Sequence, residues 1–162
     1  MLHLVRTRAI VSSIALLGLA SCGGDDVPPG TALECGGGEA SEVCEVFRLV
    51  NAERASAGLP AYEWNAELAI AAQRHAVDMV ENDYFSHESQ DGRSFSDRAD
   101  QAGYDAFATG ENIAAGQRTP EQVMDSWMGS DGHRANILSD GSNEIGVGLS
   151  DFHWVQVFGH RD

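Results

Sequence analysis

Trp127-Met-Gly-Ser-Asp-Gly-His-Arg-Ala-Asn-Ile-Leu138 is the stretch around which we expect the fold to be organised. It follows a predicted helix, and Gly129 and Gly132 break that helix just before His133. A side chain at a helix end lies at the rim of a packed core, within reach of water and of other segments. His133 is therefore a candidate for binding a ligand or transferring a proton, although a histidine after a glycine is more often an exposed loop residue.

The composition limits the class of protein and its partners. The chain has 162 residues, enough for one domain with a sizeable core, and it contains no lysine. Its formal net charge is −15 at pH 7. Without residues 1–21, which carry Arg6 and Arg8, 8 arginines remain against 25 acids, and the charge becomes −17. Such an acidic surface repels phosphate backbones, so no nucleic-acid partner is expected.

Residues 1–21 are predicted to form an export signal. Arg6 and Arg8 supply its basic start, and the apolar segment 10–20 is too short to span a bilayer as a helix. The segment ends in Leu19-Ala-Ser-Cys22, which resembles the bacterial lipoprotein box, where the cysteine after the cleavage site carries diacylglycerol. The resemblance implies a lipid anchor on Cys22, at the outer membrane or the cell surface. The alternative is an ordinary secretory signal that ends beside a cysteine.

Residues 22–40 are rich in glycine, proline and acids, so we expect a flexible tether before a globular domain at residues 41–162. Cys35 lies in the tether and Cys44 just after it. In an oxidising compartment these two remaining cysteines are expected to form a disulfide. Two unpaired thiols or a weak metal-binding pair are the alternatives.

Helices are predicted at about residues 41–57, 66–81, 95–102 and 120–129, from apolar periodicity and terminal signals. The residues expected to cap three of them are Ser41, Asn65 and Thr119. His75 falls on the apolar face of the second helix, where a hydrogen-bonded structural role is expected. Tyr84 and Phe85 are expected to fix the polar segment 82–92 to the core and so to orient His87.

The C-terminal part has the period of β-structure. Apolar and small residues alternate over residues 145–150, a second strand is predicted at 154–158, and residues 150–153 form the hairpin turn. Gly146 and Gly148 leave one strand face bare, so another element is expected to pack closely there. Helices outnumber the antiparallel strands, which predicts an α+β fold with a small sheet covered by helices.

Three segments place polar side chains beside apolar ones, and they end in His87, Glu111 and His133. Two imidazoles and a carboxylate suit zinc or another divalent cation and leave a position open for water. The separations of 24 and 22 residues match no short metal motif. A hydrolytic set of Ser130, His133 and Glu111 can also be written, but Ser130 does not lie in a strand–turn–helix elbow.

Six motifs in order resemble the CAP superfamily (cysteine-rich secretory proteins, antigen 5 and pathogenesis-related 1), specifically its bacterial SCP-like branch. They are Asn51-Ala-Glu-Arg54, Phe85-Ser-His87, Gly110-Glu-Asn-Ile-Ala114, Trp127-Met128, Gly132-His-Arg-Ala-Asn-Ile-Leu138 and Gly146-Val-Gly-Leu149. The resemblance covers about residues 43–159. It implies an α–β–α sandwich with a shallow cleft, in which His87 and His133 are the two histidines and Glu111 is the first acid.

Eukaryotic members of the family have a second cleft glutamate shortly before the second histidine. Ser130 stands in that place here, and the neighbouring Asp131 is a partial substitute. We therefore expect a binding or interaction module at the cell envelope. Its cleft of His87, Glu111, Ser130, Asp131 and His133 would hold a divalent metal, or a small envelope ligand or protein. The alternative is a metal-dependent hydrolase of peptide or cell-wall substrates, with zinc on the two histidines and Glu111 as the base.

Overall fold

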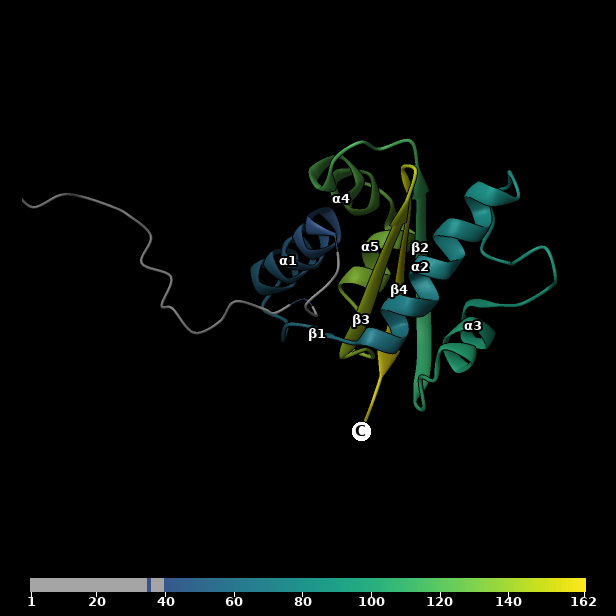
Figure 1. Cartoon of the computed structure of the whole chain (residues 1–162). Coiled ribbons are helices and arrows are strands. Elements are labelled where there is room, and N and C mark those ends of the chain that lie inside the picture. The colour runs from purple at the N-terminus through teal and green to yellow at the C-terminus, as the bar shows by residue number, and fades with distance from the viewer. Residues whose placement is uncertain (1–34, 36–39) are drawn as a thin grey trace, which may run out of the picture. The chain divides into compact units, whose positions relative to one another are not determined.

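The computed structural model describes residue 35 and residues 40–162 (Figure 1). The predicted signal sequence, Cys22 and most of the predicted tether lie outside the described residues. A disulfide joins Cys35 to Cys44, as expected for an oxidising compartment. Within the described ranges, no helix combines the length and apolar character needed to cross a membrane.

The described chain folds into helices α1 (Ser41–Ser56), α2 (Ala66–Glu81), α3 (Phe95–Ala102), α4 (Pro120–Met128) and α5 (Asp131–Ile137), with strands β1 (Glu63–Trp64), β2 (Phe107–Ala115), β3 (Glu144–Ser150) and β4 (His153–His160). The strand order is β1-β3-β4-β2. Strand β4 pairs antiparallel with both β3 and β2, so β2 forms one edge of the sheet. Strand β1, which was not predicted from the sequence, pairs parallel with β3.

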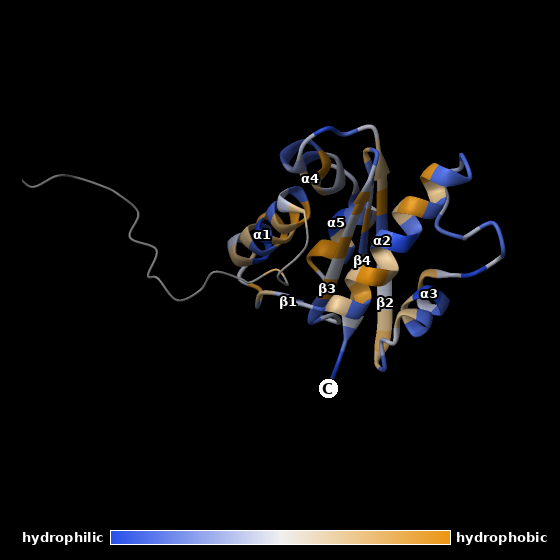
Figure 2. Ribbon diagram, viewed as in Figure 1, coloured by the Kyte–Doolittle hydropathy of each residue, from blue (hydrophilic) through white to orange (hydrophobic). Residues whose placement is uncertain are grey.

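The sheet lies between two helical layers, with α2 and α3 on one face and α1, α4 and α5 on the other (Figure 1). Alternate residues of β4 point into the two layers. Val155 and Val157 pack in the cluster beneath α2 and α3, whereas Trp154 and Phe158 pack in the cluster beneath α1 and α4. Apolar residues accordingly concentrate in the helices and strands, while the loop between α2 and α3 is hydrophilic (Figure 2). The predicted α–β–α sandwich is confirmed.

The backbones of α2 and β3 touch where the sequence predicted a close approach. A Cβ atom added to Gly146 would lie 2.0 Å from the backbone nitrogen of Ala69, and one added to Gly148 would lie 2.3 Å from that of Gln73. The Gln73 side chain also exchanges two hydrogen bonds with the backbone of Leu149, at 2.9 and 3.0 Å. Glycine is thus required in β3 because a helix backbone occupies the space of a side chain.

The predicted helix starts are mostly confirmed. The Asn65 side chain accepts a hydrogen bond from the Leu68 amide at the start of α2, and Thr119 caps α4 in the same way. The prediction for Ser41 is wrong, because helix α1 has Ala40 as its N-cap. The Ser41 hydroxyl donates to Glu42 instead.

The stretch after α4 differs from its prediction. Gly129 ends α4 as expected, but the chain at once begins another helix, α5, and His133 is its third residue. Gly132 therefore does not break a helix. A Cβ added to Gly132 would meet nothing within 4 Å, so packing does not require glycine there.

Candidate functional site

The loop between α2 and α3 (residues 82–94) carries His87. Tyr84 is half-buried against the core cluster beneath α2, and its hydroxyl donates to Asp78. Phe85 is 53% exposed, so of these two aromatic residues Tyr84 packs on the core, and the prediction that Phe85 also does so is wrong.

Buried His75 holds the same loop from below. Its side chain has no solvent exposure, and its Nε2 atom donates to the backbone oxygen of Ser86 at 2.9 Å. This confirms the structural role predicted for His75. Burial lowers the pKa of His75, and the Arg98 guanidinium lowers it further, although Glu111 and Asp78 act in the opposite direction. The ring is therefore held in its neutral form beside the residue that precedes His87.

Arg98, on the buried face of α3, fixes the remainder of the loop. Its Nη1 atom donates to the Ser89 hydroxyl at 3.1 Å and to the backbone oxygen of Arg93 at 2.9 Å. Its Nη2 atom donates to the backbone oxygen of His87 at 3.0 Å. One buried guanidinium thus binds the loop backbone on both sides of its tip.

Glu111 joins Arg98 to the His87 ring. Oε2 accepts from Arg98 Nη2 at 2.6 Å, and Oε1 accepts from His87 Nδ1 at 2.8 Å. The Glu111 and Arg98 side chains are 1% and 3% exposed, whereas that of His87 is 56% exposed. Because Nδ1 donates to the carboxylate, a neutral His87 ring carries its lone pair on Nε2, available to a ligand. A carboxylate behind the other nitrogen is the arrangement that orients metal-binding histidines.

Helix α5 is docked on strand β2 by side-chain amides. Asn112 Nδ2 donates to the backbone oxygen of His133 at 3.1 Å. Asn136 Nδ2 donates to the backbone oxygen of Glu111 at 3.2 Å and to Asn112 Oδ1 at 2.9 Å. Glu111 and Asn112 are neighbours in an edge strand, so their side chains point to opposite faces of the sheet. They hold His87 from one layer and His133 from the other, around the same edge.

The charge of His87 affects the pKa of His133. Desolvation lowers the pKa of the half-buried His133, and the nearby His87 charge lowers it further. The two histidines, 46 positions apart in the sequence, therefore lie close enough for the charge of His87 to act on His133. Protonation of His87 therefore favours the neutral, ligand-binding form of His133.

Replacing His87 by glutamine is expected to raise the pKa of His133. The substitution removes a positive charge that disfavours protonation of His133, while the desolvation that is the larger cause remains. The pKa of His133 should thus move towards its ordinary value without reaching it. Following the imidazole resonances by NMR through a pH titration measures the change. In the control His153→Gln the pKa of His133 should stay as in the parent, and an unchanged value in His87→Gln would contradict a shared site.

Glu111, Asp131 and Ser130 make contacts that differ from those of a three-ligand metal site or a hydrolytic set. Across residue 35 and residues 40–162, no group of three His, Cys, Asp or Glu side chains is arranged to hold a metal ion. Glu111 is not a third ligand, since both its oxygens are engaged. The Asp131 side chain is 95% exposed and paired with Arg134 at 2.6 Å. Ser130 is the N-cap residue of α5, and the hydrolytic set is not assembled because Glu111 contacts His87.

Arg98, Asn112 and Asn136 hold the site together and were not predicted from the sequence. The burial of Arg98 could have been predicted from helical spacing, because it lies three residues after Phe95 on the face by which α3 packs. Asn112 and Asn136 lie inside two of the quoted motifs, but a motif does not reveal which amide meets which backbone group.

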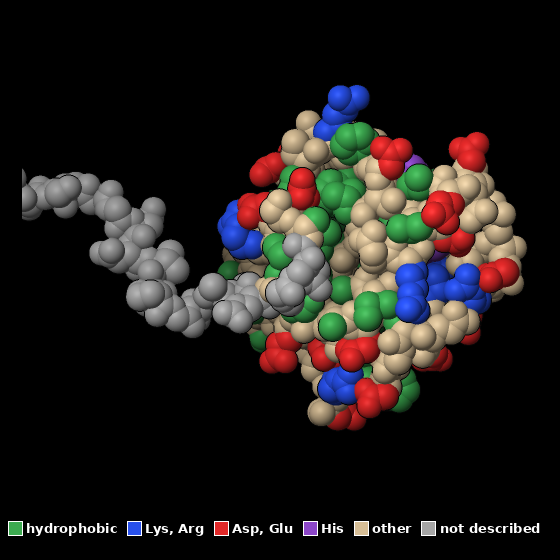
Figure 3. Space-filling view, in the orientation of Figure 1, with side chains coloured by type: hydrophobic (Ala, Val, Ile, Leu, Met, Phe, Trp, Pro, Cys, Tyr) green, Lys and Arg blue, Asp and Glu red, His purple; other side chains and the backbone are tan. Residues whose placement is uncertain are grey.

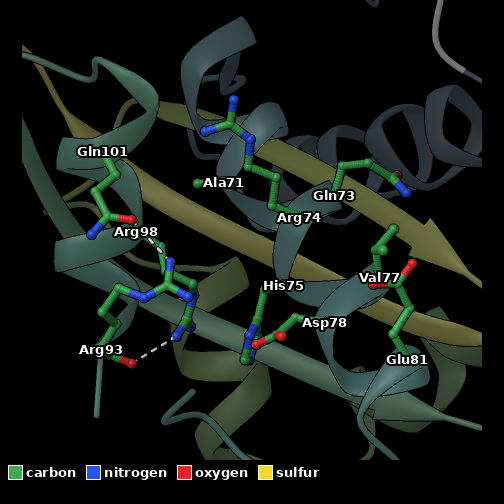
Figure 4. Close-up of a pocket in the computed structure, with 10 residues that line it drawn as sticks. All are labelled: Ala71, Gln73, Arg74, His75, Val77, Asp78, Glu81, Arg93, Arg98 and Gln101. Carbon is green, nitrogen blue, oxygen red and sulfur yellow. Dashed lines mark hydrogen bonds between the residues drawn. The ribbon is translucent and has the colours of Figure 1, made fainter. Parts of the chain in front are cut away.

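Two surface hollows adjoin these residues. One of about 240 Å³ lies beside His87 and is lined also by Glu88, Ser94 and Phe95. Another, of about 350 Å³, lies between α2 and α3, with Arg98 and His75 in its wall (Figure 4). The His87 hollow is shallow, so the site suits a ligand held at the surface rather than one enclosed in a cavity.

Comparison with known proteins places the chain in a family. Residues 47–158 match the family model described as CAP, the cysteine-rich secretory protein family. The Bacillus subtilis (strain 168) protein YkwD is 40% identical over 116 residues, covering 70% of this chain and 45% of YkwD. The membrane protein YlbC of the same organism is 34% identical over 114 residues, covering 70% of this chain and 33% of YlbC. The chain thus spans less than half the length of either relative.

Solved structures agree with this placement. An extracellular protein containing an SCP domain from Bacillus anthracis str. Ames aligns with a TM-score of 0.72 and 32% identity, covering 74% of this chain and 40% of that one. An outer surface protein from Borrelia burgdorferi aligns with a TM-score of 0.66 over 72% of this chain and 90% of its own; at 21% identity it supports the fold alone. Fold, motif order and family match agree, and the chain belongs to the CAP family, the cysteine-rich secretory protein family.

Proposed function

We propose that this CAP-domain protein is an exported binding module whose site takes a divalent cation, or a ligand that bonds to imidazole nitrogen, between His87 and His133. The observation that supports the proposal is the environment of the Glu111 carboxylate. Its carboxylate is buried and accepts hydrogen bonds from Arg98 and His87 on its two oxygens. It is thereby committed to orienting His87.

A hydrolytic role is less well supported by the same geometry. A general base must reach the water that it deprotonates. The Glu111 side chain is 1% exposed, and reaching a water would require it to give up a hydrogen bond to either Arg98 or His87. His87 is thus the exposed member of the pair and Glu111 its positioning residue.

The donor set fits a borderline cation such as zinc, which imidazole nitrogen suits. His87 would bind through Nε2, because Nδ1 is used by Glu111. His133 would supply the second nitrogen. With two protein ligands rather than three or four, the remaining positions fall to water or to a partner. We therefore expect weaker binding than at a structural zinc site, and a cation that can bridge the protein to something else.

Export is proposed on three grounds. The first 21 residues have the pattern of a signal sequence, and the described chain contains a disulfide. The related structure from Bacillus anthracis is named an extracellular protein, and that from Borrelia burgdorferi an outer surface protein. We further propose that Cys22 carries a lipid anchor at the cell envelope, which would leave the site to meet a small envelope ligand or protein.

Zinc titrated into the purified chain by calorimetry tests the site. We expect a Kd in the micromolar range, weakened at least about tenfold in both His87→Ala and His133→Ala, since each removes one of two ligands. Glu111→Gln should weaken binding by about 10- to 100-fold without abolishing it, as for residues that orient a ligand.

His160→Ala is the matched control, because His160 is half-buried and lies at the C-terminal end of β4. Its zinc affinity should equal that of the parent chain. Binding that survives both His87→Ala and His133→Ala, or that is lost equally in His160→Ala, would rule out the proposed site.

A further inference from the structure

A separate cavity lies where the end of α2 meets the turn between β3 and β4. Its volume is about 420 Å³, within the range of small-ligand sites. It is lined by Met79, Val80, Asp83, Tyr84, Phe85, Asp151 and His153. None of these residues belongs to the site formed by His87, Glu111 and His133.

The charge of this cavity is negative. Asp83 and Asp151 are exposed, and the ion pairs found among the described residues use other carboxylates. No arginine lines the cavity, and the chain has no lysine. On the face shown in Figure 3, acidic side chains are spread over the surface and basic ones form a few separate groups. Both the cavity and the surface around it therefore attract cations.

An exposed aromatic ring lines the same cavity, and a second lies in the adjoining turn. Phe85 is 53% exposed and lies 6.3 Å from the His153 ring, centroid to centroid. Phe152, between the lining residues Asp151 and His153, is 42% exposed. The Arg118 guanidinium already lies over the Phe152 ring, 5.6 Å from its centroid. Aromatic faces attract cations, and here the chain places one of its own on a ring at this turn.

The backbone supports a functional reading of the turn. Asp83, Asp151 and Phe152 have φ values of 51°, 38° and 59°, and they are the non-glycine residues of the described chain with positive φ. A two-residue hairpin turn of this kind favours glycine at the place of Phe152. Phenylalanine is usually buried and usually has a negative φ, and Phe152 departs from both preferences. Residues held in such unfavourable conformations concentrate at binding sites.

We propose that this cavity binds a basic side chain, the guanidinium of arginine or the ammonium of lysine, presented by a peptide segment of a partner protein. The charge settles against the carboxylates of Asp83 and Asp151, and the alkyl part of the side chain packs on Phe85. The partner segment is basic, which complements the net charge of −15. This inference does not depend on cation binding by His87 and His133.

Three short peptides titrated into the full chain and followed by NMR test the proposal. They are acetyl-Gly-Arg-Gly-amide, its lysine counterpart, and a counterpart with citrulline, which has the shape of arginine without its charge. We expect the arginine and lysine peptides to shift the amide signals of Asp83, Asp151 and Phe85. The citrulline peptide should bind at least about tenfold more weakly, which corresponds to about 1.4 kcal/mol.

Two variants locate the binding. Asp83→Asn with Asp151→Asn removes both charges, and asparagine adopts positive φ readily, so the fold is kept. Affinity for the arginine peptide should fall by about tenfold or more. Phe85→Leu keeps the apolar contact, loses the aromatic face, and should weaken binding by a smaller factor. Asp100→Asn with Asp125→Asn, which removes two exposed acids on α3 and α4, is the charge-matched control and should bind as the parent does.

Equal binding of the citrulline peptide would overturn the proposal, because the cavity would then recognise shape or apolar surface alone. Equal weakening in Asp100→Asn with Asp125→Asn would also overturn it, since attraction would then come from the overall charge. The absence of any shift with the arginine and lysine peptides would do the same.

Discussion

Gly146→Ala is expected to prevent folding. The added methyl group would lie 2.0 Å from the Ala69 nitrogen and 2.6 Å from the Ala69 Cα, both backbone atoms of α2 that no side-chain rotation can move away. Inserting one methyl group into a packed core commonly costs about 1–3 kcal/mol. Because a helix would have to leave the sheet here, we expect a loss above about 4 kcal/mol, comparable with much of the stability of a small domain. Gly148→Ala should behave in the same way.

Gly132→Ala is the matched control. Gly132 lies inside a helix, has open space around it, and should gain up to about 1 kcal/mol from the better helix propensity of alanine. Urea unfolding followed by circular dichroism compares the variants. A folded Gly146→Ala protein with near-parental stability would mean that the α2 and β3 backbones are further apart than described.

Arg98→Met is expected to destabilise the protein by about 3–5 kcal/mol, because it leaves the buried Glu111 carboxylate without its guanidinium partner. The same change removes the hydrogen bonds from Arg98 to the backbone of His87 and Arg93. Zinc affinity should therefore fall together with stability, although Arg98 would not touch the metal. Measuring the free energy of unfolding in urea and the zinc affinity on the same samples tests both effects.

The double variant Arg98→Met with Glu111→Leu separates the two effects. Removing the stranded carboxylate should restore much of the stability while zinc binding stays weak, because nothing then orients His87. The exposed pair Arg134–Asp131 gives the comparison, since Arg134→Met should cost less than about 1 kcal/mol. Equal costs for Arg98→Met and Arg134→Met would contradict the importance of burial.

Local signals in the sequence predicted most of the fold. Asn65 and Gly103 mark the start of α2 and the end of α3 because their side-chain and backbone preferences act within a few residues. Strand β1 has two residues and forms through its pairing with β3. Two residues are too few to show an alternating apolar pattern in the sequence. Helix α5 was missed for a related reason: Gly132 is a poor helix former, and the docking of α5 on β2 outweighs that preference.

The sequence named the residues of the proposed site but did not reveal the contacts between them. His87, Glu111 and His133 were identified by motif order, and the structure brings them to one strand edge. The partners of Glu111 were not identified, because Arg98 meets it across 13 positions and His87 across 24. Contacts of that kind depend on which face of β2 each residue occupies, and one extra residue at the irregularity between Ala108 and Gly110 is enough to change it.

Because β2 lies at the edge of the sheet, the residues that build the site also cover an edge strand. An edge strand offers unpaired backbone groups to any other extended chain, which is a common route to aggregation. Asn136 of α5 donates to the backbone oxygen of Glu111 and so occupies one backbone acceptor of this edge strand. The same docking of α5 that positions His133 therefore shields this edge, and a variant that loosens α5 should self-associate before it unfolds.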